Sequence, residues 1–132
     1  MAGINCVVVT PEETALEQEV DSIVVPLFDG SKGIQHNHAP MIGRLGAGEL
    51  KLSAAGSVQR FFLEGGFVQV LDNTVTVLTG QAVEAKTLNV DEIQSQLDEL
   101  NSKGPAVGDE QELRAQQVSS LRVQRRLARQ NS

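Results

Sequence analysis

The sequence predicts a mostly β fold with a small α appendage: an N-terminal antiparallel β-sandwich of about 8–10 strands, then a C-terminal antiparallel two-helix hairpin. Three observations support this prediction. Apolar residues alternate with polar ones over the first part of the chain, turn residues recur there about every 8–12 residues or less, and the apolar spacing becomes three and four residues after Asn89. We therefore expect a β-sandwich domain over residues 1–87 and a helical hairpin domain over residues 88–132.

Short β-branched runs mark the strands of the first domain. Residues 7–9 are three valines, and Val75 and Val77 stand between threonines. In residues 23–27, Ile23, Val25 and Leu27 alternate with Val24 and Pro26. Gly65 with Gly66, and Asp72 with Asn73, indicate turns.

The phenylalanines and one proline give expectations about the sandwich interior and its edges. All four phenylalanines, Phe28, Phe61, Phe62 and Phe67, are expected in the layer between two packed sheets. Pro26 has no backbone N–H to donate, so we expect its strand to lie at an edge or to stop there.

The helical hairpin is indicated by a change of period. An apolar stripe at spacings of three and four residues predicts the first helix, and Asn89 with Glu92 resembles a capping pair. Gly104 and Pro105 end this helix, and a second helix of about 20 residues begins near Glu110. Both helices contribute apolar residues, although those of the second are sparse: Val90, Ile93, Leu97 and Leu100, then Leu113, Val118, Leu121 and Leu127.

Composition excludes several protein classes. The chain has 132 residues, 40% of them hydrophobic and 21% charged, which is typical of a soluble globular protein. Its longest apolar run has four residues, whereas a membrane span needs about 20, so we expect contact with a membrane only through partners. The single Cys6 fits a reducing, cytoplasmic compartment.

The charge is divided unevenly along the chain. Residues 1–112 contain 6 basic and 17 acidic side chains, whereas residues 113–132 contain five arginines and no acid. An acidic body argues against nucleic-acid binding, for which a basic face of the domain is expected. The basic tail favours an acidic protein surface as its target, with a solvated helix face as the alternative.

No self-contained active site, cofactor site or metal site is predicted. The glycines of residues 43–48 lack P-loop spacing, and His36, His38 and Cys6 lack a fourth zinc ligand. No Gly-x-Ser-x-Gly elbow accompanies His38. Two alternatives remain open, a stand-alone β-sandwich ligand-binding module and a small hydrolase.

The segment of residues 30–40 resembles the epsilon subunit of F-type ATP synthase. That family has a Gly-x-x-Gly-Ile turn, three variable residues and His-Ala-Pro, matched here by Gly30, Gly33, Ile34, His38, Ala39 and Pro40. Residues 65–70 with 73–78 are similar to its paired strands after a Gly-Gly turn, and residues 121–123 fit near its end.

The resemblance implies a non-catalytic central-stalk subunit with the same sandwich and hairpin. Its expected partners are the gamma subunit, the c-ring and the alpha/beta catalytic hexamer, with the chemistry in the beta subunits. It would couple ion-driven c-ring rotation to ATP synthesis at the cytoplasmic face of the bacterial inner membrane. Its C-terminal helices would inhibit ATP hydrolysis.

The resemblance also implies site residues. A loop facing the c-ring and gamma would comprise Thr10, Ser31 and His38, held by Gly30, Gly33, Ile34, Ala39 and Pro40. Ser31 replaces an acidic residue of some relatives. The inhibitory helix would present Arg114, Arg122, Arg125, Arg126 and Arg129.

Regulatory ATP, which some bacterial members bind on the folded hairpin, is not expected here. Gln94, Gln116 and Ser120 stand where the resemblance places arginines. Without those charges a triphosphate has few groups to pair with. We therefore expect no cofactor.

Overall fold

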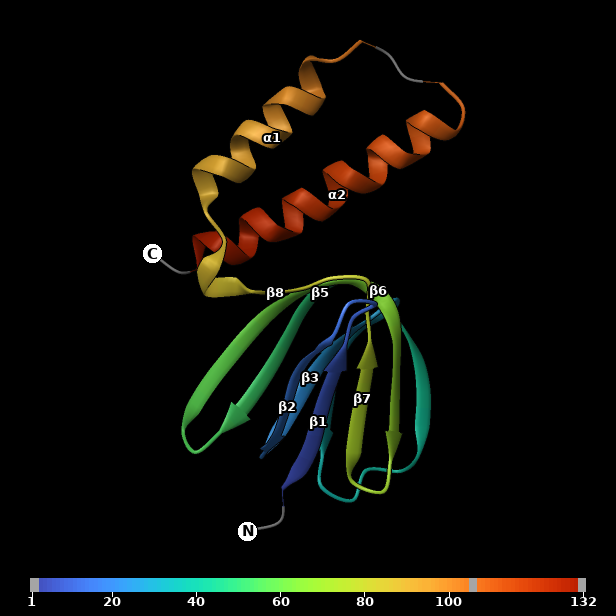
Figure 1. Ribbon diagram of the computed structural model, residues 1–132, viewed down its shortest axis with the longest axis vertical. Coiled ribbons are helices and arrows are strands. Elements are labelled where there is room, and N and C mark those ends of the chain that lie inside the picture. The colour runs from blue at the N-terminus through green and yellow to red at the C-terminus, as the bar shows by residue number, and fades with distance from the viewer. Residues whose placement is uncertain (1–2, 105–106, 131–132) are drawn as a thin grey trace. The chain divides into compact units, whose positions relative to one another are not determined.

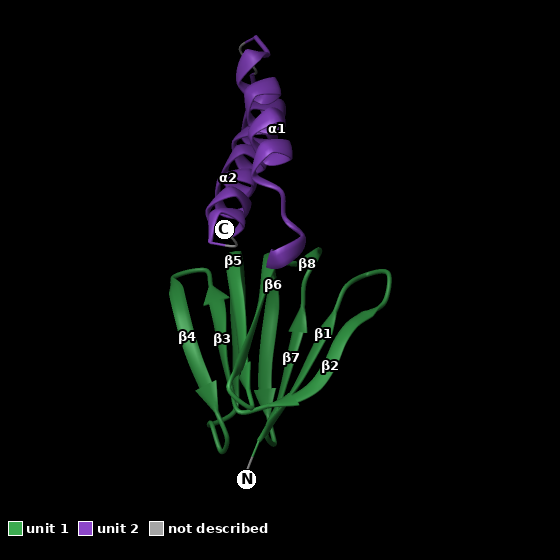
Figure 2. Ribbon diagram, turned by 90° about the vertical axis from the view of Figure 1, so that its left-hand side faces the viewer, with its two compact units in different colours: residues 1–84 green, residues 85–132 purple. Residues whose placement is uncertain are grey.

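The protein consists of two compact units, residues 1–84 and residues 85–132 (Figure 2). A computed structural model describes residues 3–104 and 107–130. Pro105, expected to end the first helix together with Gly104, lies outside the described residues. The two units divide between Glu84 and Ala85, and the sequence placed the boundary after Thr87.

The first unit is a β-sandwich of eight described strands, as predicted (Figure 1). They are β1 (Ile4–Val9), β2 (Thr14–Val20), β3 (Ser22–Leu27), β4 (Gly30–Gln35), β5 (Met41–Ala54), β6 (Ser57–Leu71), β7 (Thr74–Leu78) and β8 (Ala82–Glu84). Their order is β2-β1-β7-β6-β5-β3-β4, with β8 paired to β6. The described pairs are antiparallel except β1 with β7, which is parallel, so the sheet is mixed.

The two long strands β5 and β6 join the halves of the sandwich. β6 pairs with β8 through residues 61–63 and with β7 through residues 67–71, so it changes partner at Gly65 and Gly66. The prediction of a turn at these glycines was wrong, because they bend a continuous strand. The predicted turn at Asp72 and Asn73 is confirmed, since both have positive φ between the paired Leu71 and Thr74.

The core of the first unit is aliphatic. Val, Ile and Leu side chains from seven strands fill it, and Cys6 lies among them. Phe62 is buried and Phe61 packs against this core, but Phe28 and Phe67 are 71% and 56% exposed, so their predicted burial was wrong. Each lies at a position whose side chain is directed away from the core.

Pro26 does not lie in an edge strand, the first of the two expected positions, but its strand stops one residue later at Leu27, as the second allowed. It is buried in β3, which pairs with both β4 and β5. The register of β3 with β5 shifts between Val24 and Leu27, and this irregularity accommodates the missing N–H.

The second unit is the predicted pair of helices, preceded by a 3₁₀ turn at Ala85–Thr87. Helix α1 spans Val90–Ser102 and α2 spans Asp109–Arg129. The Asn89 side chain accepts hydrogen bonds from the Asp91 and Glu92 amides at 2.9 and 3.2 Å, which confirms the cap.

A small apolar cluster joins α1 and α2. Ile93, Leu97 and Ala128 are buried in it, and the partly buried residues around it are Leu88, Val90, Val118 and Leu121. Leu113, which was expected on the apolar face, is 56% exposed. Neither helix within the described ranges has the length and apolar character required to cross a membrane.

Candidate functional site

The first unit presents an exposed apolar face on the outside of β5, β6 and β7. The cross-strand register places Arg44 opposite Phe67 and Phe67 opposite Leu78. Because side chains alternate along a strand, this row lies on the opposite face from the buried Val68, Val70, Val75 and Val77. We call the following set the outer apolar face: Phe28, Ile42, Phe67, Leu71 and Leu78, which are 45–77% exposed.

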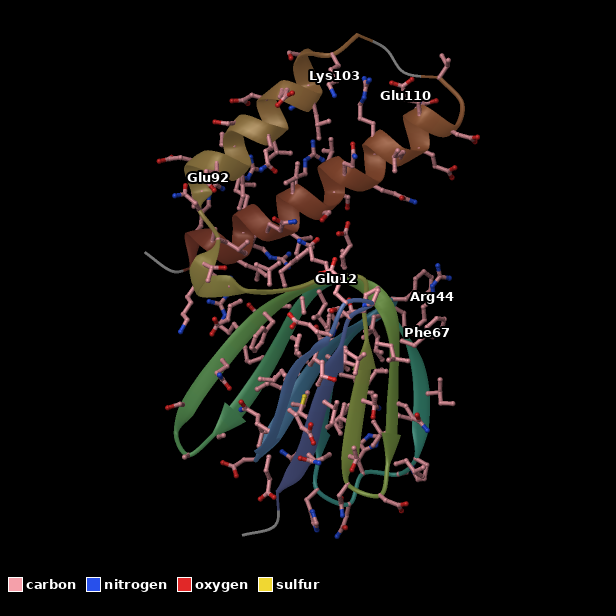
Figure 3. All side chains as sticks on the ribbon, viewed as in Figure 1. Glu12, Arg44, Phe67, Glu92, Lys103 and Glu110 are labelled. Carbon is pink, nitrogen blue, oxygen red and sulfur yellow. The ribbon has the colours of Figure 1, made fainter. Side chains whose placement is uncertain are left out.

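Arg44 is the cationic residue of this face. Its guanidinium carbon lies 5.4 Å from the centre of the Phe28 ring, within cation–π range. The Phe28 amide donates to the Arg44 carbonyl oxygen at 2.8 Å, which fixes the two residues together. Figure 3 shows Arg44 and Phe67 projecting from the same side of the sandwich.

The structure divides the predicted c-ring and gamma loop between two ends of the sandwich. Gly30, Ser31, Gly33 and Ile34 belong to β4, and Ile34 is fully buried, so it can only anchor the segment. Cross-strand partners follow one another across the sheet at this end: Gly30 is opposite Leu27, Leu27 is opposite Leu45, and Leu45 is opposite Gly66. The next residue of β6, Phe67, is opposite Leu78, which is opposite Val9. Thr10 follows Val9 and Ser31 follows Gly30, so both lie toward the same end of the sandwich.

His38, Ala39 and Pro40 lie toward the other end of the sandwich, beside the β6–β7 turn. The Asn37 amide donates to Asn73 Oδ1 at 2.6 Å, and the Asn73 side-chain amide donates to Asn37 Oδ1 at 3.5 Å. These bonds tie the loop to the turn. β1 separates the two ends by about 20 Å, given its six residues at about 3.3 Å each.

Each end of the sandwich has an open pocket. One of about 420 Å³ is lined by Ser22, Ile23, Val24, Gly33, Ile34, Gln35, His36, Asn37 and His38. Another of about 650 Å³ is lined by Thr10, Glu12, Glu13, Ala15, Glu64, Gly80, Gln81, Ala82 and Val83. Neither combines an apolar interior with convergent basic groups that would indicate an anionic ligand.

In the described part of the chain, each histidine Nδ1 is bound to a backbone carbonyl oxygen. His36 Nδ1 lies 3.0 Å from the Gly3 carbonyl oxygen, and His38 Nδ1 lies 2.7 Å from that of Ala39. Because a carbonyl only accepts, each Nδ1 carries the hydrogen and donates it. Within residues 3–104 and 107–130 no three His, Cys, Asp or Glu side chains are grouped to hold a metal ion.

Two arginines of α2 are bound within the hairpin. Arg114 Nη1 donates to the Gly104 carbonyl oxygen at 2.6 Å, beyond the C-terminal end of α1, and Arg114 Nη2 lies 3.4 Å from Glu110 Oε1. Arg125 Nη1 donates to Gln94 Oε1 of α1 at 2.9 Å. Both arginines therefore hold α2 to α1 while the hairpin is folded.

The other three arginines lie on the exposed side of α2. Arg122, Arg126 and Arg129 are spaced by four and three residues and so share one helix face. The sequence grouped all five arginines together. In the fold, Arg114 and Arg125 make contacts between the helices, and Arg122, Arg126 and Arg129 form what we call the exposed arginine stripe.

Gln94, Gln116 and Ser120 occupy the three positions at which the resemblance places arginines, and their surroundings differ. Gln94 binds Arg125 and also donates to Asp98 Oδ1 at 3.0 Å. Ser120 is buried and its hydroxyl accepts from Gln124 Nε2 at 3.3 Å, whereas Gln116 is exposed. None of these groups supplies a positive charge.

Known proteins are similar to this chain both over the sandwich alone and over nearly its whole length. Residues 3–85 match the family model described as ATP synthase, Delta/Epsilon chain, beta-sandwich domain. The ATP synthase epsilon chain of Rhodopirellula baltica is 42% identical over 127 residues, covering 96% of this chain and 99% of that one. The epsilon chain of Leptospira borgpetersenii is 35% identical over 103 residues, covering 78% and 81%.

Solved structures share the fold at low sequence identity. A chain of the Euglena gracilis mitochondrial ATP synthase, solved as OSCP/F1/c-ring, superposes with a TM-score of 0.78 at 21% identity, covering 92% of this chain and 81% of that one. A chain of the Tetrahymena thermophila mitochondrial ATP synthase central stalk and c-ring gives 0.72 at 19% identity, covering 94% and 95%.

Proposed function

The chain belongs to the ATP synthase delta/epsilon family, and from this premise we propose that it is a non-catalytic central-stalk subunit of a rotary ATP synthase. It couples ion-driven rotation of the c-ring to ATP synthesis in the alpha/beta catalytic hexamer. The observation that carries this proposal is the exposed outer apolar face on a sandwich that matches the family model over residues 3–85.

The gamma subunit is the partner proposed for the outer apolar face. Its five hydrophobic side chains, from β5, β6, β7 and the residue after β3, form an exposed apolar surface of the kind that marks protein interfaces. Burial of such side chains supplies the free energy of association, and the rigid sheet keeps the ordering cost low. The sandwich is therefore the coupling unit.

The c-ring contact is proposed at one end of the sandwich. Thr10 and Ser31 lie toward one end and His38, Ala39 and Pro40 toward the other, so a flat ring surface meets one set. Cysteine placed at Ser31 and, separately, at Ala39 distinguishes them by disulfide crosslinking, under a mild oxidant, to a cysteine introduced on the exposed surface of the c subunits. The native Cys6 is buried and does not compete.

The hairpin is proposed to inhibit ATP hydrolysis. The exposed arginine stripe has no acid beside it in sequence after residue 112, and it suits an acidic segment of a catalytic beta subunit. The two interhelical arginines, Arg114 and Arg125, oppose opening of the hairpin. We propose that ATP plays no part in this balance, because Gln94, Gln116 and Ser120 offer no charge to a triphosphate.

The location proposed is the cytoplasmic face of the bacterial inner membrane, where gamma and the c-ring hold the chain. This placement depends on the family and on the proposed partners.

ATP hydrolysis by the matching catalytic complex tests the proposal. The complex is reconstituted with the full chain or with residues 1–86, and gamma binding is measured by pull-down in parallel. We expect both forms to bind gamma and only the full chain to depress hydrolysis. If neither form binds gamma, the stalk function is wrong and a ligand-binding module becomes the leading alternative. Binding without inhibition would remove the regulatory role alone.

A further inference from the structure

We propose that Arg44 binds a carboxylate of the partner that covers the outer apolar face. The inference rests on the proposed docking of gamma at this face and adds one chemical requirement: the gamma segment over β5 and β6 carries an Asp or Glu side chain directed at Arg44. This pair would set the register and specificity of an otherwise apolar contact.

Arg44 lies within the apolar face. It is opposite Phe67 in the β5–β6 register, and Ile42 is two residues before it on the same side of β5. Phe28 lies under the guanidinium on the β3 side. A partner that covers Phe28, Ile42 and Phe67 therefore covers Arg44 as well.

Covering this guanidinium requires a compensating partner group. An arginine does not deprotonate in proteins, so the charge must be retained when water is removed. No acidic side chain among the described residues forms an ion pair or hydrogen bond with Arg44, whereas Arg60 and Lys51 on the same sheet both meet Glu49. The Phe28 ring attracts the charge from 5.4 Å but is no substitute for an anionic hydrogen-bond acceptor.

The surroundings of Arg44 favour a carboxylate. The Phe28 ring lies 5.4 Å from the guanidinium carbon, and no described side chain takes a hydrogen bond from the Arg44 N–H groups, so they remain for a partner. Two parallel N–H donors match the two oxygens of a carboxylate, and this geometry is stronger and more selective than a bond to a neutral carbonyl. The Phe28 contact also holds the side chain in place before the partner arrives, which reduces the ordering cost of the new pair.

The affinity of the full-length chain for the gamma subunit tests this assignment. Arg44→Met keeps the length and apolar character of the side chain but removes the charge, and we expect it to weaken binding by about tenfold or more. Arg44→Lys keeps the charge without the planar fork, so an intermediate loss is expected. Lys51→Met removes one positive charge from the same strand while Glu49 keeps its shorter contact with Arg60, so it is the matched control, with an expected change of less than about twofold.

The possible outcomes distinguish a failure of the Arg44 pairing from a failure of the proposed stalk function. If the unmodified chain binds gamma and Arg44→Met binds equally well or more tightly, the carboxylate is absent and the inference is wrong although the stalk function stands. If the unmodified chain does not bind gamma, the proposed function fails first.

The partner residue can then be identified. The carboxylates of gamma are changed one at a time to the matching amides and tested against the unmodified chain and Arg44→Met. We expect one amide variant to lose as much affinity as Arg44→Met and to cause little further loss when the two are combined. Additive losses for every gamma variant would overturn the pairing.

Discussion

Gly66 shows how a single residue permits the bend of β6. Its φ is +115°, and a Cβ at this position would overlap the backbone carbonyl of Leu78 on the neighbouring strand. Gly65 also has a positive φ, of +71°. The pair therefore lets one strand serve two partners, β8 before the bend and β7 after it.

Substitution of Gly66 tests that requirement. We expect Gly66→Ala to lower the free energy of unfolding by about 3 kcal/mol, because both the backbone conformation and the space oppose a methyl group. Gly33→Ala is the control, since its Cβ would meet nothing within 4 Å and its φ is not positive; the expected change is below about 0.5 kcal/mol. Urea denaturation measures both. Equal effects would show that the bend tolerates a side chain.

Cys6 is a second residue whose environment fixes its chemistry. Burial in the aliphatic core raises the pKa of its thiol from 9.0 to about 12. At neutral pH this lowers the thiolate fraction by roughly 1,000-fold. The folded state prefers the protonated thiol, so the free energy of unfolding falls as pH rises from about 9 towards 12.

Thiol labelling measures the protection of Cys6. At pH 8 we expect Cys6 in the folded chain to react with a maleimide or disulfide reagent at least about 100-fold more slowly than in urea. Rapid labelling under native conditions would contradict the burial. A denaturant series would then show whether reaction follows opening of the sheet.

At the scale of elements, helix α2 uses its arginines for two purposes. Arg114 and Arg125 bind α1 and its C-terminal end, while Arg122, Arg126 and Arg129 form the exposed stripe. The apolar cluster of the hairpin is small, so one charged hydrogen bond is a considerable part of what holds the helices together. The hairpin is built to be stable yet separable.

Two substitutions in α2 should act in opposite directions. Arg125→Met removes the bond to Gln94, and we expect about 1 kcal/mol less protection of α1 amides from hydrogen exchange, together with stronger inhibition as the hairpin opens more easily. Arg122→Met should leave exchange unchanged within about 0.5 kcal/mol and weaken inhibition. If both variants change exchange and inhibition alike, the division of the arginines has no functional meaning.

At the scale of the whole molecule, the two units differ in how much they bury. Fifteen core residues of the described chain form one cluster in the sandwich, whereas the helices share three buried residues with four partly buried ones around them. Because apolar burial is the main stabilising term, the helices should open before the sheet.

Native-state hydrogen exchange resolves the two units. We expect amides of α1 and α2 to exchange through openings of lower free energy than amides of β5, β6 and β7. A single exchange free energy shared by helices and strands would show one cooperative unit and contradict this expectation. Residues 1–86 alone should retain the exchange pattern of the strands.

Local patterns in the sequence determined the fold class, the Asn89 cap, the helix bounds and the family resemblance, because alternation, capping and turn chemistry act over a few neighbouring residues. They did not determine which face of a strand becomes the core. Phe28 and Phe67 were expected inside. The alternation along the strand showed that Val68 and Val70 lie on one face and Phe67 and Leu71 on the other. It did not show which of the two faces is buried.

Only the tertiary structure decided which residues meet across strands and helices. The pairing of Arg44 with Phe67, the bulge that accommodates Pro26 and the division of the α2 arginines depend on registers between segments far apart in sequence. A shift of one residue in any of these registers would turn a strand over, and many side chains together select the register that buries the most apolar surface. A short window of sequence cannot contain that choice, so the outer apolar face and the position of Arg44 within it emerge from the assembled sheet.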